Sequence, residues 1–230
     1  MTFVPIYMAI SQESKTLKWR LAQRLERWWW RRYLKGQSPE TYREWKSAYW
    51  KQFYALIESD VALVPGDTIA DIGCGPAGIF SFFRNNPVTA VDPLLDSYEG
   101  DLDVFKKSDY PNTRFITSSI EDFEAQEQFN LVCCLNAINH VSDLPLAFSK
   151  LYALTNEGGY CALSIDAHNH AFLKHLFRTI PGDALHPHQY DLQEYEEMMV
   201  KAGFRLLKTE LYKKQPIFNY YLLLGKKEKA

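Results

Sequence analysis

The fold of this chain is decided by residues 69–78, which read IADIGCGPAG. Apolar residues with strand character run directly into three glycines. Glycine lets the backbone turn sharply and approach a ligand closely, because it has no side chain. In open α/β sheets, ligands bind just beyond the carboxyl ends of the strands. The stretch therefore predicts a strand, a ligand-binding turn and a helix that follows it.

The charge at the start of this turn indicates which ligand it holds. Gly73, Gly75 and Gly78 fit the G-x-G-x-x-G pattern of dinucleotide-binding turns. Asp92 follows about twenty residues on, where such turns carry a ribose-binding acid. Asp71 argues against a dinucleotide ligand, because a carboxylate at the entrance of the turn repels a pyrophosphate. S-adenosylmethionine carries a positive α-amino group, a positive sulfonium and no phosphate, so the turn favours it over a dinucleotide.

Downstream of the turn, short apolar runs alternate with helical stretches, which is typical of a parallel sheet. The last two runs are too close together for a crossover, so they predict an antiparallel hairpin. We expect an α/β, Rossmann-like, doubly wound fold whose seven-stranded sheet is mostly parallel. The predicted strands are Thr68–Cys74, Val88–Asp92, Thr113–Ser119, Phe129–Asn136, Tyr160–Asp166, Phe204–Lys214 and Phe218–Lys226.

The N-terminal part has a different composition. All six tryptophans lie within the first fifty residues, and the turn signal Val64–Asp67 comes shortly after them. We therefore divide the chain into an N-terminal helical cap or lid, residues 1–62, and a second domain, residues 63–230.

Two helices are predicted in this N-terminal segment. The second begins after Ser38, which caps it, has Pro39 at its first position, and runs to about Asp60. The first is amphipathic. Its apolar stripe consists of Leu17, Leu21, Leu25 and Trp28.

The same segment is basic, although the whole chain has a net charge of -2. Residues 15–35 hold eight lysines or arginines against one acid, Glu26. Three interpretations stay open: a cap whose tryptophans pack on the sheet domain or on a second subunit, a lid over the substrate, and a peripheral membrane contact. The small overall charge argues against nucleic acid as a partner. A monomer and a homodimer are both compatible with the sequence.

The cysteines and the first residues favour a cytoplasmic location. No C-x-x-C pair occurs, and every cysteine lies in an apolar stretch, as small buried residues in a reducing compartment do. These residues are Cys74, Cys133, Cys134 and Cys161. The apolar opening, residues 1–10, lacks the basic start and the cleavage site of a signal peptide.

Residues 71–78, DIGCGPAG, resemble the first motif of class I S-adenosylmethionine-dependent methyltransferases, D-x-G-x-G-x-G, with Ala77 at the third glycine. Val91-Asp92 resembles the second motif, whose acid binds both ribose hydroxyls. Residues 116–123, ITSSIEDF, resemble the segment that contacts adenine, with Ser119 in place of the usual aspartate.

Three later stretches resemble the same family, in the family's order. Residues 129–143, FNLVCCLNAINHVSD, resemble the fourth motif of the methyltransferase type 11 branch, which contains quinone-biosynthesis enzymes. Residues 156–159, NEGG, resemble the turn before the fifth strand, with Glu157 in place of a proline. Residues 201–204, KAGF, resemble the opening of the final hairpin. The ordered series covers roughly residues 64–228 and is more specific than any single motif.

The resemblance implies an enzyme that transfers a methyl group from S-adenosylmethionine to an oxygen, nitrogen or carbon of a small-molecule acceptor. The residues implied to hold the cofactor are Asp71, Gly73, Cys74, Gly75, Gly78, Asp92, Pro93, Ser119, Ile120 and Asn136. The candidates that face the reaction are His140, Asn136, His168 and His188.

A base near the methyl group is needed when the acceptor must lose a proton. His140 is the first candidate because it directly follows the fourth strand, although capping of the local helix explains a histidine there equally well. No metal is expected. Asn136 and Asn139 stand where some related O-methyltransferases carry acids, and neutral amides hold a divalent cation poorly.

Two functions of other classes remain as alternatives. A methyltransferase-like binding subunit would keep the fold without turnover, and the substitutions at Ser119 and Glu157 leave it open. A nicotinamide-dependent oxidoreductase would bind NADH and not S-adenosylhomocysteine. Asp71 argues against the oxidoreductase, and the intact acids Asp71 and Asp92 argue against the binding subunit.

Overall fold

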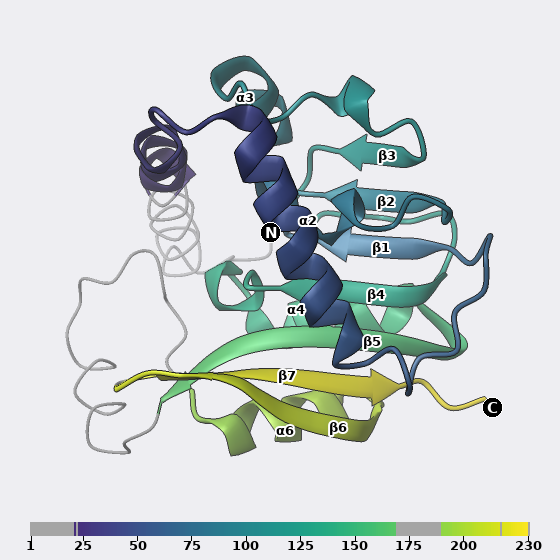
Figure 1. Cartoon of the computed structure of the whole chain (residues 1–230). Helices are drawn as coiled ribbons and strands as arrows, with labels where there is room; N and C mark the ends of the chain where they lie inside the picture. Colours follow the sequence, from purple (N-terminus) through teal and green to yellow (C-terminus); the bar gives the residue numbers. More distant parts are fainter. Residues whose placement is uncertain (1–20, 22, 169–189, 217, 230) are drawn as a thin grey trace, which may run out of the picture.

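The computed structural model describes residue 21 and residues 23–168, 190–216 and 218–229. Its centre is a seven-stranded sheet with the strand order β3-β2-β1-β4-β5-β7-β6 (Figure 1). Strands β1 to β5 pair in parallel, whereas β7 is antiparallel to both of its neighbours. This confirms the predicted fold, a mostly parallel doubly wound sheet with a C-terminal antiparallel hairpin.

All seven strands lie where the sequence predicts them, and they differ from the prediction mainly at their ends. The first four stop before the residues that enter the loops at the carboxyl edge. The fifth begins earlier than predicted, because Thr155 pairs with Phe129 ahead of an irregularity in the register. The bounds are β1 Ile69–Ile72, β2 Val88–Val91, β3 Thr113–Ile116, β4 Phe129–Leu135, β5 Thr155–His168, β6 Arg205–Lys214 and β7 Phe218–Lys226.

Helices cover both faces of the sheet (Figure 1). Helices α2 (Pro39–Ala55) and α3 (Leu95–Asp101) pack on one face, and α4 (Leu144–Leu154) and α6 (Leu192–Lys201) on the other. Side chains of β4 alternate between the two layers, as the pleat of a strand requires. The four cysteines are free and buried, as the sequence predicts.

The turn after β1 folds around the carboxyl group of Asp71. This side chain is 2% exposed, and its Oδ2 accepts the backbone N–H of Phe80 at 3.0 Å. The prediction of a helix here is wrong: two 3₁₀ turns follow, η1 (Gly75–Ala77) and η2 (Ile79–Ser81). An α-helix would direct the N–H of Phe80 to the carbonyl of Pro76, but Asp71 takes that donor instead.

Helix α2 contributes directly to the core. Trp50 and Phe53 are buried, and the indole Nε1 of Trp50 donates to the carbonyl of Ala77 at 2.8 Å. The helix begins as predicted, with Ser38 accepting the N–H of Thr41, but it ends at Ala55 rather than near residue 60.

The earlier helix covers residues 23–33, and its orientation differs from what the apolar stripe suggests. Leu21, Leu25 and Trp28 are 52%, 38% and 60% exposed. Glu26 instead accepts a hydrogen bond from the hydroxyl of Tyr98 at 3.1 Å, and Arg27 pairs with Asp101, both on the α3 side. Leu17 lies outside the described residues. No helix in the described part of the chain is long and apolar enough to cross a membrane.

Replacing Trp50 by phenylalanine is expected to lower the free energy of unfolding by about 1–3 kcal/mol, because the buried carbonyl of Ala77 loses its donor. Denaturant unfolding measures this. The matched control is Trp45→Phe on the same helix, which is expected to stay within about 0.5 kcal/mol because Trp45 is exposed. Equal effects of the two changes would contradict this role of Trp50.

Gly78→Ala is expected to destabilise the protein by about 1–3 kcal/mol, the scale of overpacking. An added Cβ would lie 2.3 Å from Asp71 Oδ2 and 2.7 Å from the carbonyl oxygen of Cys74. Gly100→Ala in α3 is the control, since its Cβ meets nothing within 4 Å. That change is expected to be neutral or to stabilise the helix by up to about 1 kcal/mol, as seen in thermal melts.

Candidate functional site

A cavity of about 500 Å³ opens at the carboxyl edge of the sheet, where the loops after β1, β2, β3 and β4 meet. The strand order reverses between β1 and β4, and open α/β sheets bind their ligands at such a point. The wall includes nine of the residues that the sequence singles out: Gly73, Cys74, Gly75, Asp92, Pro93, Ser119, Ile120, Asn136 and His140.

The other predicted site residues lie elsewhere or outside the described part. Asp71 and Gly78 sit beneath the turn after β1 and do not line the cavity. His168 ends strand β5, but its side chain is not described. His188 lies outside the described residues.

Two glycines let the turn after β1 form the floor of the cavity. Gly73 has a φ of +67°, and a Cβ there would lie 2.3 Å from the Cβ of Ala137. Gly75 has a φ of +56° and lies under the ring of Trp30, which would be 3.7 Å from an added Cβ. A side chain at Gly73 is excluded by space, and at both positions by backbone conformation.

Asp92 follows β2 and closes one side of this floor. Its two oxygens accept backbone N–H groups, Oδ2 from Gly75 at 2.9 Å and Oδ1 from Leu94 at 2.8 Å. Burial and the nearby charge of Glu26 raise the pKa of Asp92 to about 7, although the two N–H donors oppose the shift. The carboxyl group is therefore fixed in position and has lone pairs left for further donors.

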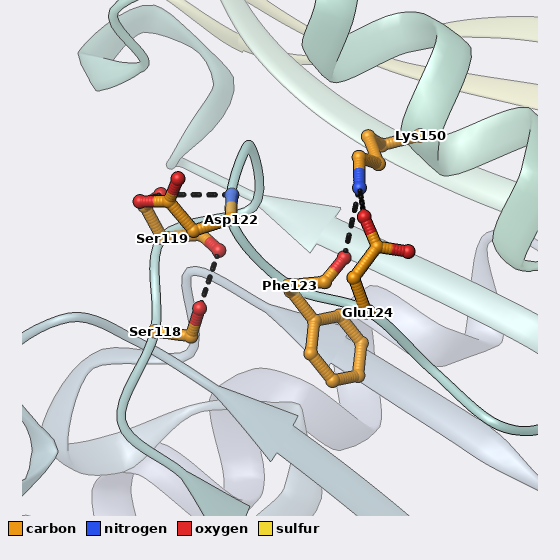
Figure 2. Close-up of polar contacts among 6 residues, drawn as sticks. All are labelled: Ser118, Ser119, Asp122, Phe123, Glu124 and Lys150. Atoms are coloured by element: carbon orange, nitrogen blue, oxygen red, sulfur yellow. Dashed lines mark hydrogen bonds and ion pairs between the residues drawn. The ribbon is translucent and has the colours of Figure 1, made fainter.

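The segment after β3 is held in place by its own hydrogen bonds (Figure 2). The hydroxyl of Ser119 accepts the N–H of Asp122 at 3.2 Å and donates to its carboxylate at 2.9 Å. Ser118 donates to the carbonyl of Ser119, and Lys150 of α4 donates to the carbonyl of Phe123 (Figure 2). Both the donor and an acceptor lone pair of the Ser119 hydroxyl are therefore engaged by Asp122.

Asn136 follows β4 directly and has a conformation that few residues other than glycine adopt. Its φ is +55°, and it is the one non-glycine residue with a positive φ in the described part of the chain. Its N–H donates to Ser164 Oγ at 2.7 Å, whose hydroxyl donates back to Asn136 Oδ1 at 3.1 Å; Tyr212 contacts the same Oδ1 at 3.4 Å. Such strain persists where surrounding contacts enforce it, and it concentrates at functional sites.

His140 lies beyond Asn136 in the 3₁₀ turn η4 (Ile138–His140), exposed on the cavity wall. Asn139 points away, because its Oδ1 accepts the hydroxyl of Tyr195 in α6 at 2.6 Å. Among the described residues, no three histidine, cysteine or acidic side chains gather as metal ligands do.

The sequence analysis does not single out the residues that the N-terminal segment adds to the cavity. Gln23, Glu26, Trp29 and Trp30 come from the helix over residues 23–33, and Lys46 and Trp50 come from α2. Only the interpretation of the N-terminal segment as a lid indicated that its residues reach the cavity. Helical periodicity does not tell which loop a side chain will face.

Comparisons with known proteins agree with this geometry. A family model described as a methyltransferase domain matches residues 42–209, more than half of the chain. The chain is 27% identical over 148 residues to malonyl-[acyl-carrier protein] O-methyltransferase 1 of Ilyobacter polytropus. That match covers 62% of this chain and 54% of the relative, so the chain spans about half the relative's length.

Two solved structures share the fold at low sequence identity. Magnesium protoporphyrin IX methyltransferase of Synechocystis PCC 6803, with bound S-adenosylhomocysteine, has a TM-score of 0.58 at 16% identity, covering 90% of this chain and 95% of that one. The 1,6-didemethyltoxoflavin-N1-methyltransferase of Burkholderia thailandensis has a TM-score of 0.56 at 13% identity, covering 99% and 94%. The family match over residues 42–209, together with the order of the strands, places this chain among the class I S-adenosylmethionine-dependent methyltransferases.

Proposed function

We propose that this methyltransferase moves the methyl group of S-adenosylmethionine to an oxygen, nitrogen or carbon atom of a small-molecule acceptor in the cavity at the carboxyl edge. The observation that carries the proposal is Asp92, a fixed carboxyl group on the cavity wall beside the glycine turn. A carboxylate there accepts hydrogen bonds from both ribose hydroxyls, and it repels a phosphate.

The strand order suggests how the cofactor lies. Ser119 and Ile120 follow β3, Asp92 follows β2, and the glycine turn follows β1. In the proposed pose, adenine lies against the β3 loop and the ribose lies at Asp92. The methionine part of the cofactor therefore extends over the glycine turn toward β4. In this pose the backbones of Gly73, Cys74 and Gly75 approach the cofactor, and Pro93 borders the ribose.

Asp71 and Gly78 act indirectly in this proposal. Asp71 holds the turn by accepting the N–H of Phe80, and Gly78 leaves the space for its carboxyl group. Both shape the cofactor site without touching the cofactor.

Asn136 and His140 lie at the β4 end, where the methyl group would point. Methyl transfer is an in-line displacement, so alignment of the acceptor with the sulfonium accounts for much of the rate. His140 is the candidate base for an acceptor that loses a proton, and Asn136 is the candidate for orienting it.

The N-terminal segment up to residue 62 is proposed to serve as both cap and lid. Helix α2 packs in the core, whereas the helix over residues 23–33 lies across the cavity and supplies Trp30 above Gly75. A lid of this kind excludes water from the reaction.

The nature of the acceptor atom is left broad. The names of the similar proteins include both an O-methyltransferase and an N1-methyltransferase. An oxidoreductase is disfavoured by the site. Its pyrophosphate would need a helix N-terminus, whereas two 3₁₀ turns follow β1 and acids line the wall. A binding subunit without turnover is separated from an enzyme only by measuring methyl transfer.

Calorimetric titration tests the cofactor site. The wild type is expected to bind S-adenosylhomocysteine with micromolar affinity, and Asp92→Ala to weaken binding by about 1–3 kcal/mol, the scale of lost hydrogen bonds to a charged group. Asp103→Ala, which removes an exposed acid, is the control and is expected to bind like the wild type. No binding to the wild type, or binding of NADH in its place, would overturn the proposal. A screen of acceptors that yields S-adenosylhomocysteine would then establish turnover.

Affinity for S-adenosylhomocysteine is expected to depend on pH through Asp92. Its pKa is raised to about 7, and the ribose hydroxyls need the charged form as acceptor. Binding below pH 7 must therefore release a proton, so affinity is expected to fall about fivefold between pH 7 and pH 6 and to change by no more than about twofold between pH 7 and pH 8. Asp92→Asn should bind more weakly with a flatter profile between pH 6 and pH 7. An unchanged slope in that variant would assign the titration to another group.

A further inference from the structure

Lys46 is the single lysine or arginine that lines the cavity within the described part of the chain. The acids Glu26, Asp92 and Glu121 also line it. The cavity therefore has an acidic side and one cationic point. The question is what that cation serves.

Lys46 is placed by aromatic rings. Its Nζ lies 5.3 Å from the ring centroid of Trp45, 5.3 Å from that of Tyr49 and 5.2 Å from that of Trp50. Contacts of this kind attract the ammonium group and restrict where it can go. Lys46 also lies one helical turn before Trp50, which is tied to the carbonyl of Ala77, so both side chains face the glycine turn.

Within the described ranges of the chain, the cation has no carboxylate partner. None of the described acids places an oxygen within the 4.0 Å of a salt bridge to Lys46 Nζ. Asp71 is the acid whose charge acts on it, but the carboxyl group of Asp71 lies beneath the turn and is used by the N–H of Phe80. Burial lowers the pKa of Lys46 to about 8, against the opposing effect of Asp71. A partly desolvated ammonium group without a counter-ion favours an anion in its cavity.

The cofactor pose proposed above brings an anion to Lys46. Adenine and ribose lie on the β3 and β2 side, so the methionine end of the cofactor reaches the turn after β1, over which Lys46 stands. The cofactor has a single anionic group, the α-carboxylate, at that end. Resting on the proposed function, we infer that Lys46 is the counter-ion of the cofactor's α-carboxylate, held in place by Trp45, Tyr49 and Trp50.

Two ligands isolate this contact. S-adenosylhomocysteine carries both the α-amino group and the carboxylate, whereas 5′-deoxy-5′-(3-aminopropylthio)adenosine keeps the amino group and lacks only the carboxylate. Calorimetric affinities of both are compared in the wild type, Lys46→Gln, Lys46→Arg and Lys51→Gln. Lys51 is an exposed lysine of the same helix and serves as the matched control.

The expected result is specific to one ligand. Lys46→Gln should weaken S-adenosylhomocysteine about 10- to 100-fold, as loss of a charged hydrogen bond does, and should leave the amine analogue within about twofold. Lys46→Arg should recover most of the loss, and Lys51→Gln should change neither ligand. Retained binding of the analogue also shows that the variant is folded.

Other results overturn the inference. A variant with a wild-type melt that loses both ligands equally, or neither, would assign Lys46 a structural role or an anion of the acceptor. If Lys46→Gln does not fold, the comparison of the two ligands in the wild type still tests the inference. A wild type that binds both ligands equally has no site for the carboxylate, which overturns the inference. A wild type that binds neither ligand would instead refute the cofactor site itself, so the two failures are distinguishable.

Discussion

The site depends on one buried hydrogen bond, from the N–H of Phe80 to the carboxyl group of Asp71. A buried carboxyl group is costly unless it is bonded, and here burial raises its pKa to about 7. The chain meets that requirement by wrapping the turn after β1 around the group, which needs glycine at position 78. The same wrapping lays Gly73 and Gly75 open as a floor. The acid that defines the sequence motif thus shapes the backbone of the turn, and this backbone forms the floor of the cavity.

The second constraint is the strand order. Because β4 lies on the other side of β1 from β2, the loops after these strands diverge and leave a cavity between them. The sheet provides only its floor and one wall. The remaining wall comes from the N-terminal segment, which is fastened by the hydrogen bond from Trp50 to Ala77 and by contacts of Glu26 and Arg27 with the α3 side. The cavity is therefore built from parts of the chain that are far apart in sequence.

The strands and the cofactor side of the cavity were predictable from the sequence because they depend on local signals. Apolar runs, glycine spacing and the acid at position 92 each report on a few neighbouring residues. The helix expected after the turn was wrong, because a side chain nine residues upstream captured a donor that helix formation requires. The apolar stripe of the first helix was misleading for a similar reason: Leu25 and Trp28 are exposed, whereas Glu26 and Trp30 face the cavity. The position of Lys46 on the cavity wall could not be predicted from the sequence, since only tertiary packing brings α2 over the turn.

The crowding of every tryptophan into the first fifty residues has an optical consequence. Trp29, Trp30 and Trp50 line the cavity, and no tryptophan follows residue 50. Tryptophan emission from this protein therefore comes from the N-terminal segment, whereas the strands of the sheet contribute only tyrosine emission. Selective excitation of tryptophan therefore reports on the N-terminal segment, including three residues of the cavity wall, without a contribution from the strands beneath it.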